Sequence, residues 1–393
     1  MDVSYGQQAE NFSAELRAWL ADSLPEQWRA PGFWADQPVD EAFGRRRQWE
    51  ADKAAAGFAG IQWPVEYGGR GGTPAMKAVY DEEMARAHAP TTVNSLGLTF
   101  LAPTVMAIGT PEQQAEIIGP LLRNEVIWCQ GFSEPNAGSD LAAVATRAVV
   151  DGEEYVVNGQ KIWTSNALHA DRMFALVRTS SEGRKHEGIT MLLIDLHAPG
   201  VEIRPLKQMS GALDFGEVFF TDVRVPRSAV LGVEHGGWKV AMLLLSFERG
   251  GSALGQYEAF RGEVYDIVAL AHSTERDGQP AAQDALLRQK IAAEVVELEL
   301  LRLHSYHVLT QVEQGRELGA ASSVTKLQWS ETHQDIGELF TDVTGAEHQV
   351  AGGDPTAAAL QASFLWSRSE TIWGGSSEIQ RGIVAERLLG LPR

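Results

Sequence analysis

The sequence predicts an α+β fold in which helices, then strands, then helices follow one another along the chain. Three observations predict it: apolar stripes at helical spacing near the start, short apolar runs between polar turns in the middle, and a long helical stripe towards the end. We therefore expect an N-terminal all-α domain at residues 1–126, a central β-domain of barrel or sandwich type at 127–234, and a C-terminal α-helical domain at 235–393.

The first part of the chain carries clear helix signals. Its first apolar stripe consists of Phe12, Leu16, Trp19 and Leu20. The pair Thr73-Pro74 predicts a helix start, because proline suits the first helical turn, where its missing N–H is not needed. Thr110 and Gln113 have the spacing of a capping box, in which two side chains satisfy free backbone N–H groups at a helix start.

The central part shows strand signals. We expect a hairpin turn at Asp151-Gly152, which lies between two apolar β-branched pairs, and a second turn at Thr221-Asp222. The apolar runs 174–177 and 189–194 have the length of strands. Several short strands joined by polar turns predict a compact β-domain.

The last part contains one long amphipathic helix. We expect it from Ala285 to about Val312, because apolar residues recur there at helical spacing. The residues of this stripe are Leu287, Ile291, Val295, Leu298 and Leu301. Loops are expected at 275–280 and 352–355, where glycine and proline occur together.

Composition and charge exclude several classes of function. The chain has 393 residues and a formal net charge of -19, with no dense run of Lys or Arg, so nucleic-acid binding is not expected. Its one cysteine, Cys129, permits neither an internal disulfide nor a Cys-rich metal site and fits a reducing compartment. The start of the sequence lacks the pattern of a signal peptide, and no apolar run has the length of a membrane span. We therefore expect a cytoplasmic protein that does not enter a membrane.

Several common motifs of catalysis and binding do not occur. The sequence has no Gly-x-Gly-x-x-Gly after a strand, no P-loop, no His-Glu-x-x-His and no Gly-x-Ser-x-Gly. His304 and His307 lie three residues apart on the long helix, but nothing indicates a third ligand, so no metal site is predicted.

The most informative stretch is residues 128–140, which combines Ser133, Asn136, Gly138 and Ser139 directly after an apolar run. Such a segment exposes backbone N–H groups and hydroxyls of the kind that hold a phosphate-bearing ligand, although it is also ordinary turn chemistry. A second hydroxyl-rich, Trp-containing segment follows at 161–166. The two together predict one planar aromatic ligand that is held from two sides.

Glu248 ends an almost unbroken apolar helix, residues 238–248. A carboxylate beside that much hydrocarbon loses hydration, which raises its pKa and makes it a stronger base. The residues alone leave a second interpretation open, in which Glu248 only ends the buried face and reaches solvent or an ion pair.

Four segments, residues 132–141, 161–166, 247–249 and 371–381, together resemble the acyl-CoA dehydrogenase family in their order and spacing. The resemblance covers nearly the whole chain. It implies the family's fold, with an N-terminal helical domain, a central β-domain and a C-terminal four-helix bundle, and it implies FAD between the last two.

The resemblance also assigns binding roles to individual residues. The positions that match FAD contacts are Phe132, Ser133, Gly138, Ser139, Trp163, Thr164, Ser165, Arg276, Gly345, Ser376 and Glu378. Within this set, Ser165 would lie near the reactive N5 atom. Arg276 would reach the FAD of a neighbouring subunit, although Asp277-Gly278-Gln279 replaces the Gln-Phe-Gly that usually follows this arginine. The positions that match substrate contacts are Ser139, Arg249 and Trp373.

The chain departs from many family members at the catalytic position of the C-terminal loop. Those members carry the catalytic glutamate directly after an aromatic residue, but here Gly374 follows Trp373. A smaller branch, similar to isovaleryl-CoA and steroid-side-chain acyl-CoA dehydrogenases, places the glutamate before an arginine on the preceding helix. Glu248 precedes Arg249 in this way, so the resemblance implies that Glu248 is the base. The Gly374 N–H and a ribityl hydroxyl of FAD would bind the thioester carbonyl.

The implied reaction converts an acyl-CoA thioester to a 2,3-enoyl-CoA and passes electrons to an electron-transfer flavoprotein. The resemblance also implies a homo-oligomer, a dimer or tetramer, or a mixed tetramer in which this chain needs a second subunit. Other open alternatives are oxidation of a nitroalkane or of an acyl group on a carrier protein. The charge of -19 counts against a DNA-binding flavoprotein relative.

Overall fold

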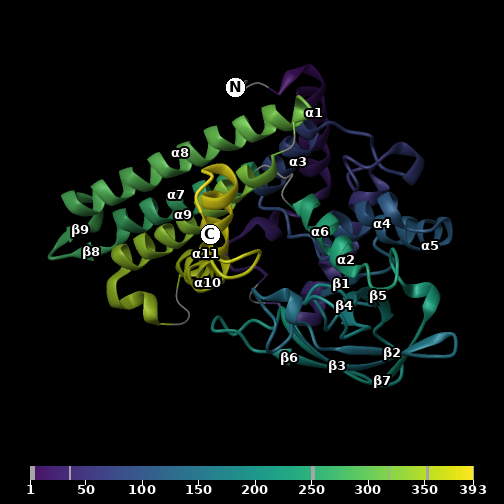
Figure 1. Ribbon diagram of the computed structural model, residues 1–393. Helices are drawn as coiled ribbons and strands as arrows, with labels where there is room; N and C mark the ends of the chain where they lie inside the picture. The colour runs from purple at the N-terminus through teal and green to yellow at the C-terminus, as the bar shows by residue number, and fades with distance from the viewer. Residues whose placement is uncertain (1–4, 35–36, 249–252, 317, 351–353, 393) are drawn as a thin grey trace. The chain divides into compact units, whose positions relative to one another are not determined.

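The computed structural model describes residues 5–34, 37–248, 253–316, 318–350 and 354–392 (Figure 1). It divides the chain into two compact units, each formed from separate stretches. The first unit comprises Met1–Pro38, Gly72–Pro90 and Arg249–Arg393, and the second comprises Val39–Gly71 and Thr91–Glu248. The order of helices, strands and helices along the chain confirms the predicted α+β fold class.

The second unit is built on a seven-stranded sheet. Its strands are β1 (Trp128–Gly131), β2 (Arg147–Asp151), β3 (Glu154–Ser165), β4 (Arg172–Arg178), β5 (Ile189–Asp195), β6 (Val201–Leu206) and β7 (Phe215–Pro226). Their order is β1-β4-β2-β3-β7-β6, and β5 also pairs with β4. The pairs β2–β3, β3–β7, β6–β7 and β4–β5 are antiparallel, whereas β1 and β4 run parallel.

Strand β4 is buried on both faces, because its side chains alternate between two hydrophobic cores. Met173, Ala175 and Val177 face a core that includes side chains of β2, β3 and β7. Phe174 and Leu176 face the opposite way, into a core shared with helices. The period of two along a strand therefore explains why residues 174–177 are apolar throughout.

The helices of the second unit are α2 (Val39–Ala55), α4 (Ala102–Ile108), α5 (Pro111–Leu122) and α6 (Gly237–Glu248). Val105, Leu121 and Leu244, from α4, α5 and α6, enter the core that contains Phe174. The predicted capping box of α5 is confirmed: Thr110 Oγ1 accepts from Gln113 N, and Gln113 Oε1 accepts from Thr110 N.

One predicted turn of the β-domain is confirmed and one is wrong. β2 and β3 form the expected hairpin, in which Asp151 pairs with Glu154 and Gly152 has φ +63°. The turn expected at Thr221-Asp222 is instead a bulge inside the continuous strand β7. The Asn158 side chain donates to Asp222 Oδ1 and accepts from Asp222 N, so the bulge satisfies the polar groups that suggested a turn.

The first unit is helical. Its helices are α1 (Gly6–Ser23), α3 (Pro74–Arg86), α7 (Leu254–Ser273), α8 (Ala285–Glu313), α9 (Ser322–Thr344), α10 (Pro355–Glu370) and α11 (Ser377–Ile383). Thr73 caps α3 as predicted, because its hydroxyl accepts from Met76 N. The helices α7, α8, α9 and α10 share one hydrophobic core, to which Phe260, Leu298, Phe340 and Leu360 each contribute a buried side chain.

The long helix is confirmed as α8, but the prediction that Val295 belongs to its apolar stripe is wrong. Val295 is exposed, whereas Leu287, Leu298 and Leu301 are buried. Alternating helical steps of four and three residues lead from Leu287 through positions 291 and 294 to Leu298. Position 294, and not 295, therefore lies on the buried side of the helix, and its residue, Glu294, is half-buried. Burial, with Asp335 and Glu297 nearby, raises the pKa of Glu294 to about 7.

The loop expected at 275–280 is a small hairpin of β8 (Glu275–Arg276) and β9 (Gln279–Pro280). Asp277 and Gly278 both have positive φ, as the turn between such closely spaced strands requires. Of the loop expected at 352–355, residues 352 and 353 lie outside the described part of the chain.

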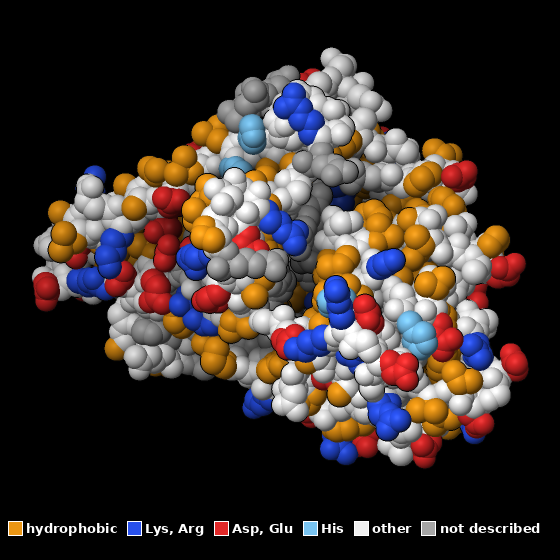
Figure 2. Space-filling model, in the orientation of Figure 1, with side chains coloured by type: hydrophobic (Ala, Val, Ile, Leu, Met, Phe, Trp, Pro, Cys, Tyr) orange, Lys and Arg blue, Asp and Glu red, His pale blue; other side chains and the backbone are white. Residues whose placement is uncertain are grey.

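On the face drawn in Figure 2, acidic and basic side chains are interspersed. In the part of the chain that the structure describes, no helix combines the length and hydropathy of a membrane span.

Candidate active site

The segment that follows β1 forms a tight turn. Glu134 and Ala137 exchange backbone hydrogen bonds of 3.0 Å in both directions, which folds the chain back on itself. Phe132 is buried and packs edge-to-face on Phe174, with ring centroids 6.0 Å apart. Beyond the turn, Gly138 and Ser139 are exposed.

The far end of β3 is distorted at Trp163. The register with β7 shifts between Lys161 and Thr164, and Trp163 has φ +57°, in the left-handed region. A bulge of this kind re-aims a side chain, and the Trp163 side chain is 58% exposed although it lies in a central strand. Thr164 is buried and Ser165 is half-buried.

The structure brings these two segments together. Ile162 N donates to Ser133 O at 3.0 Å, so the turn after β1 lies against the bulged end of β3. Lys161 reinforces this contact, since its ammonium donates to the Phe132 carbonyl at 3.2 Å and contacts Glu134 Oε1 at 2.7 Å. The two hydroxyl-rich segments therefore lie next to each other within this unit.

Lys161 and Glu134 form a buried ion pair beneath the junction. Their side chains are 0% and 7% exposed. Burial lowers the pKa of Lys161 to about 8, and the Glu134 carboxylate offsets part of that effect. Burial would raise the pKa of Glu134, but Lys161 and the backbone N–H groups of residues 145 and 146 outweigh it and hold this pKa below its usual value. Both groups are therefore ionised at pH 7.

The residues at the junction fit a planar polar cofactor such as a flavin. Thr164 Oγ1 is buried and has no hydrogen-bond partner among the described residues. Such a hydroxyl costs about 1–3 kcal/mol when left unsatisfied, and a ligand atom would recover that cost. A Cβ placed on Gly138 would meet nothing within 4 Å, so open space adjoins the backbone there. The exposed indole of Trp163 offers an apolar face beside these polar groups.

The second group of predicted site residues lies in the loop between α10 and α11 and at the start of α11. Trp373 lies 5.6 Å from Trp329 and 6.3 Å from Trp366, measured between ring centroids. Gly374 follows with φ +66°, and its carbonyl accepts from Gln380 Nε2 at 2.9 Å. Within the described residues, the Gly374 N–H makes no hydrogen bond. This amide is therefore available as a donor.

Ser376 and Glu378 begin α11. The Ser376 hydroxyl accepts from Ile379 N and caps the helix, so this part of the predicted site has a structural task of its own. Hydrogen bonding of the Glu378 carboxylate to its own backbone N–H and to Ser376 holds its pKa below the usual value.

The two remaining cofactor predictions of the first unit lie elsewhere. Arg276 is half-buried on the β8–β9 hairpin, which projects at the far ends of α7 and α8 (Figure 1). Gly345 ends α9 with φ +60°, a conformation that favours glycine at a helix C-terminus. Both assignments stay predictions.

The predicted base, Glu248, is the last residue of α6. Three side chains of α6 are buried in the core that this helix shares with the sheet: Val240, Ala241 and Leu244. Their packing fixes the position of α6 against the sheet. The Glu248 side chain and all of Arg249 lie outside the described residues, so the roles of both stay predictions.

Two polar groups of the site were not predicted. Lys161 had a usable signal, because the period of two along β3 places it on the same face as the buried Tyr155 and Val157. The sequence gives no such signal for Glu134, because the partner of a turn residue is evident only in the folded chain. His304 contacts the Thr325 hydroxyl at 3.0 Å, and the described residues contain no group of three or more side chains suited to hold a metal ion.

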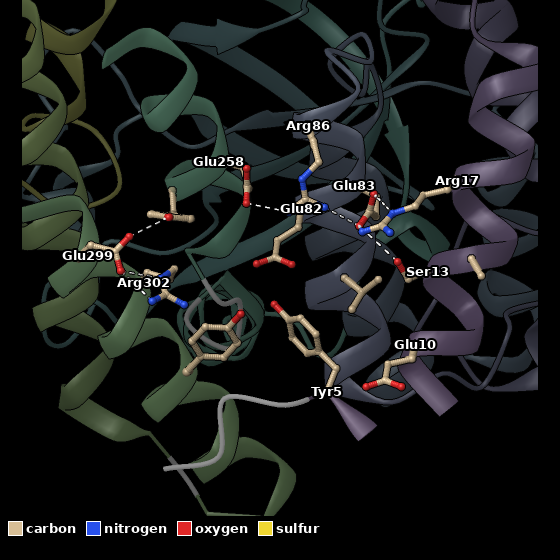
Figure 3. Close-up of a pocket in the computed structure, with 14 residues that line it drawn as sticks. Tyr5, Glu10, Ser13, Arg17, Glu82, Glu83, Arg86, Glu258, Glu299 and Arg302 are labelled. Carbon is tan, nitrogen blue, oxygen red and sulfur yellow. Dashed lines mark hydrogen bonds and ion pairs between the residues drawn. The ribbon is translucent and has the colours of Figure 1, made fainter. Parts of the chain in front are cut away.

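A cavity of about 490 Å³ lies in the first unit, between α1, α3, α7 and α8 (Figure 3). None of the predicted site residues lines it. Its charged side chains are largely paired with one another: Glu83 with Arg17 and Arg86 at 2.7 and 2.6 Å, and Glu258 with Arg86 at 2.8 Å. We interpret the cavity as the space around an ion-pair network that joins these helices.

Replacing Glu83 by glutamine should destabilise this network by about 2 kcal/mol, because two arginines lose a charged hydrogen-bond acceptor, although their own exposure screens part of the effect. The arginines hold the pKa of Glu83 below its usual 4.5 despite burial. Its contribution is therefore present above pH 4.5 and is lost as the pH falls through the folded-state pKa. Urea unfolding of the variant and the wild type at pH 7 and below pH 4 measures both effects.

The matched control is Glu10→Gln, which neutralises a carboxylate that lines the same cavity without an ion pair among the described residues. We expect the control to change stability by less than about 0.5 kcal/mol. A Glu83 variant as stable as this control at pH 7 would contradict the structural role of the network.

Comparison with known proteins gives a match along nearly the whole chain. Three family models match in order: "Acyl-CoA dehydrogenase, N-terminal domain" at residues 7–125, "Acyl-CoA dehydrogenase, middle domain" at 129–223 and "Acyl-CoA dehydrogenase, C-terminal domain" at 235–389. The chain is 43% identical to "Acyl-CoA dehydrogenase IpdE1" of Mycobacterium tuberculosis over 388 residues, which are 98% of this chain and 99% of the relative.

Two solved structures are similar over their full length. One is described as the ChsE4-ChsE5 complex from Mycobacterium tuberculosis, with 30% identity and a TM-score of 0.86 over 100% of both chains. The other is described as the Tcur3481-Tcur3483 steroid ACAD, with 31% identity and a TM-score of 0.86, again over 100% of both chains.

Proposed function

Because the chain belongs to the acyl-CoA dehydrogenase family, which uses FAD, we propose that it binds FAD and removes two hydrogens from the α and β carbons of an acyl-CoA. The product would be a 2,3-enoyl-CoA, and an electron-transfer flavoprotein would accept the two electrons. The observation that carries the proposal is the junction of Ser133 with the bulged end of β3, which presents Trp163 beside the unpartnered hydroxyl of Thr164.

We assign the cofactor to two sets of residues. Phe132, Ser133, Gly138 and Ser139 would contact the flavin and the pyrophosphate from the turn after β1. Trp163, Thr164 and Ser165 would lie along the ring system, with Thr164 Oγ1 gaining the partner that it lacks. From the first unit, the expected contacts are Ser376 and Glu378, with Gly345 and Arg276, the last towards a neighbouring subunit. Bound FAD would supply the two-electron acceptor that takes the β-hydrogen as hydride.

The remaining chemistry falls to side chains and amides of this chain. Glu248 would accept the α-proton, and its place at the end of an apolar helix favours a desolvated, more basic carboxylate. The unused Gly374 N–H would donate to the thioester carbonyl, where negative charge develops as the α-proton leaves. Trp373, Arg249 and Ser139 would contact the substrate.

The relatives favour a steroid-type acyl group. One similar solved structure is described as a steroid ACAD. We therefore propose a bulky, polycyclic acyl-CoA as the substrate class, in place of a short straight chain.

Anaerobic addition of acyl-CoA to the FAD-loaded protein tests the proposal. We expect a steroid-derived acyl-CoA to bleach the flavin absorbance, and butyryl-CoA to do so more slowly. The corresponding free acid, which lacks the activated thioester, should leave the flavin oxidised. Bleaching by a nitroalkane but by no acyl-CoA would contradict the proposal.

A second candidate is that this chain is one subunit of a two-chain dehydrogenase. Two similar solved structures are described as pairs of different chains, ChsE4-ChsE5 and Tcur3481-Tcur3483. A chain that is colourless when purified alone, and yellow when co-purified with a second family member, would favour this form. A yellow, active homo-oligomer would exclude it.

A further inference from the structure

The loop that carries Gly374 is folded back on the last turn of α10. Ile372 N and Trp373 N both donate to Ser369 O, at 2.9 and 3.1 Å, and Trp373 Nε1 donates to Ser369 Oγ at 3.0 Å. Ser377 N closes the loop by donating to Thr371 O at 3.0 Å. The position of the Gly374 amide therefore depends on where α10 ends.

The end of α10 is held by a buried carboxylate. Glu370 is the last residue of α10 and is 5% exposed. One of its carboxylate oxygens lies 2.5 Å from His333 Nδ1, and the other accepts from Trp366 Nε1 at 3.0 Å. Its backbone carbonyl accepts from Lys326 Nζ, and the same ammonium lies 5.8 Å from the centre of the Trp373 ring. Glu370 thus joins α9, α10 and the loop.

His333 on α9 bridges two carboxylates. Its Nε2 lies 3.2 Å from Glu263 Oε2 on α7 and 2.8 Å from Ser363 Oγ, and the Ser363 hydroxyl donates to Glu263 Oε1 at 2.7 Å. Because the Ser363 proton goes to Glu263, both ring nitrogens of His333 face acceptors, an arrangement that only the imidazolium satisfies fully. The Phe260 ring stacks on the imidazole at 4.2 Å and keeps water away.

The two carboxylates keep this buried imidazole charged. Burial alone would lower the pKa of His333, but hydrogen bonds and charge from Glu263 and Glu370 outweigh it and raise the pKa to about 9. The charged groups that face the bridge are Glu263 on α7, Glu370 on α10 and, through the Glu370 carbonyl, Lys326 on α9.

We propose that His333 is a positioning residue for the dehydrogenation: its imidazolium fixes Glu370, and with it the turn from which the Trp373–Gly374 peptide reaches the substrate carbonyl. This role rests on the proposed function. In the folded protein the imidazolium, and with it the bridge, is lost as the pH rises through about 9, the raised pKa of His333. The contribution of the bridge to stability is fully present near pH 6.5, the ordinary pKa of histidine, and is lost over the same rise to about 9.

The first test needs no substrate. Trp373 packs on Trp329 and Trp366, so its emission reports on the loop, and the difference between wild type and Trp373→Phe isolates that signal. We expect this emission to change with a midpoint near pH 9 in the wild type and to stay flat from pH 7 to 10 in His333→Gln. A flat wild-type titration overturns the proposal even if the variant does not fold.

The second test follows flavin reduction by acyl-CoA between pH 6 and 10. We expect the wild-type rate to fall with a midpoint near pH 9. His333→Gln and Glu370→Gln should reduce flavin roughly ten-fold more slowly, with no midpoint in this range, because a misplaced donor costs catalysis without removing it. The matched control is His307→Gln, an exposed histidine of α8, which should behave as wild type. Wild-type rates and profile in both bridge variants would overturn the proposal.

The two proposals fail in different ways. If no acyl-CoA reduces the flavin of the wild type at any pH, the proposed function has failed, and the emission titration still decides the role of His333. If the wild type is active and its emission does not titrate, only the role of His333 has failed.

Discussion

Glu248→Gln should slow flavin reduction by acyl-CoA by at least about a hundred-fold, while leaving a folded, yellow protein. Glutamine keeps the size and polarity of the side chain but cannot accept the α-proton. Loss of a general base slows a reaction by about 10²–10⁴-fold. By the resemblance to the family, Gly374 occupies the position where many members carry the base, and a glycine there offers no second carboxylate to replace Glu248.

Stopped-flow measurement of the bleaching of flavin absorbance, under anaerobic conditions and with saturating acyl-CoA, gives the rate directly. The matched control is Glu234→Gln, which makes the same chemical change just before α6, at a half-buried carboxylate paired with Arg227. We expect acyl-CoA to reduce the flavin of this control at the wild-type rate. Equal rates in Glu248→Gln and Glu234→Gln would remove Glu248 from the mechanism.

Lys161→Met should have the largest effect on stability of any change at the site. It leaves the Glu134 carboxylate buried without its cation, a change that typically costs about 3–5 kcal/mol. It also removes the hydrogen bonds from Lys161 to the Phe132 and Leu176 carbonyls. The turn after β1 would then lose its main side-chain link to β3, so we expect FAD to be released as well.

The double variant Glu134→Gln/Lys161→Met tests whether the pair or the packing matters. Removing both charges leaves no uncompensated ion, so the double variant should be more stable than Lys161→Met alone. Urea unfolding and the flavin retained after gel filtration measure the two effects separately. If the double variant loses as much free energy of unfolding as Glu134→Gln and Lys161→Met lose together, the two groups act independently.

The features that the sequence predicted are those with local causes. The capping box at Thr110 and the hairpin at Asp151-Gly152 depend on residues three or four positions apart, and both are confirmed. The turn expected at Thr221-Asp222 is wrong because a distant partner, Asn158, satisfies the same polar groups inside a bulge. Local pattern cannot separate a turn from a bulge when the deciding partner lies on another strand.

The same distinction holds at the candidate site. The hydroxyl-rich segments around Ser133 and Trp163 were visible as composition, whereas the contact between them required the pairing of strands. The Glu263–His333–Glu370 bridge joins three helices over more than a hundred residues of sequence, and no spacing rule relates its members. Side chains that position other site residues are therefore harder to predict than side chains in a motif expected to contact the ligand.

Exchange of the α-hydrogens with solvent tests the central claim most directly, because it isolates the proton transfer assigned to Glu248. An acyl-CoA deuterated at C2 is incubated anaerobically in water with FAD-loaded protein, and the recovered thioester is analysed by mass spectrometry. We predict rapid loss of deuterium with the wild type and with Glu234→Gln, and none above the enzyme-free rate with Glu248→Gln. Loss of deuterium at the wild-type rate in Glu248→Gln would contradict the account.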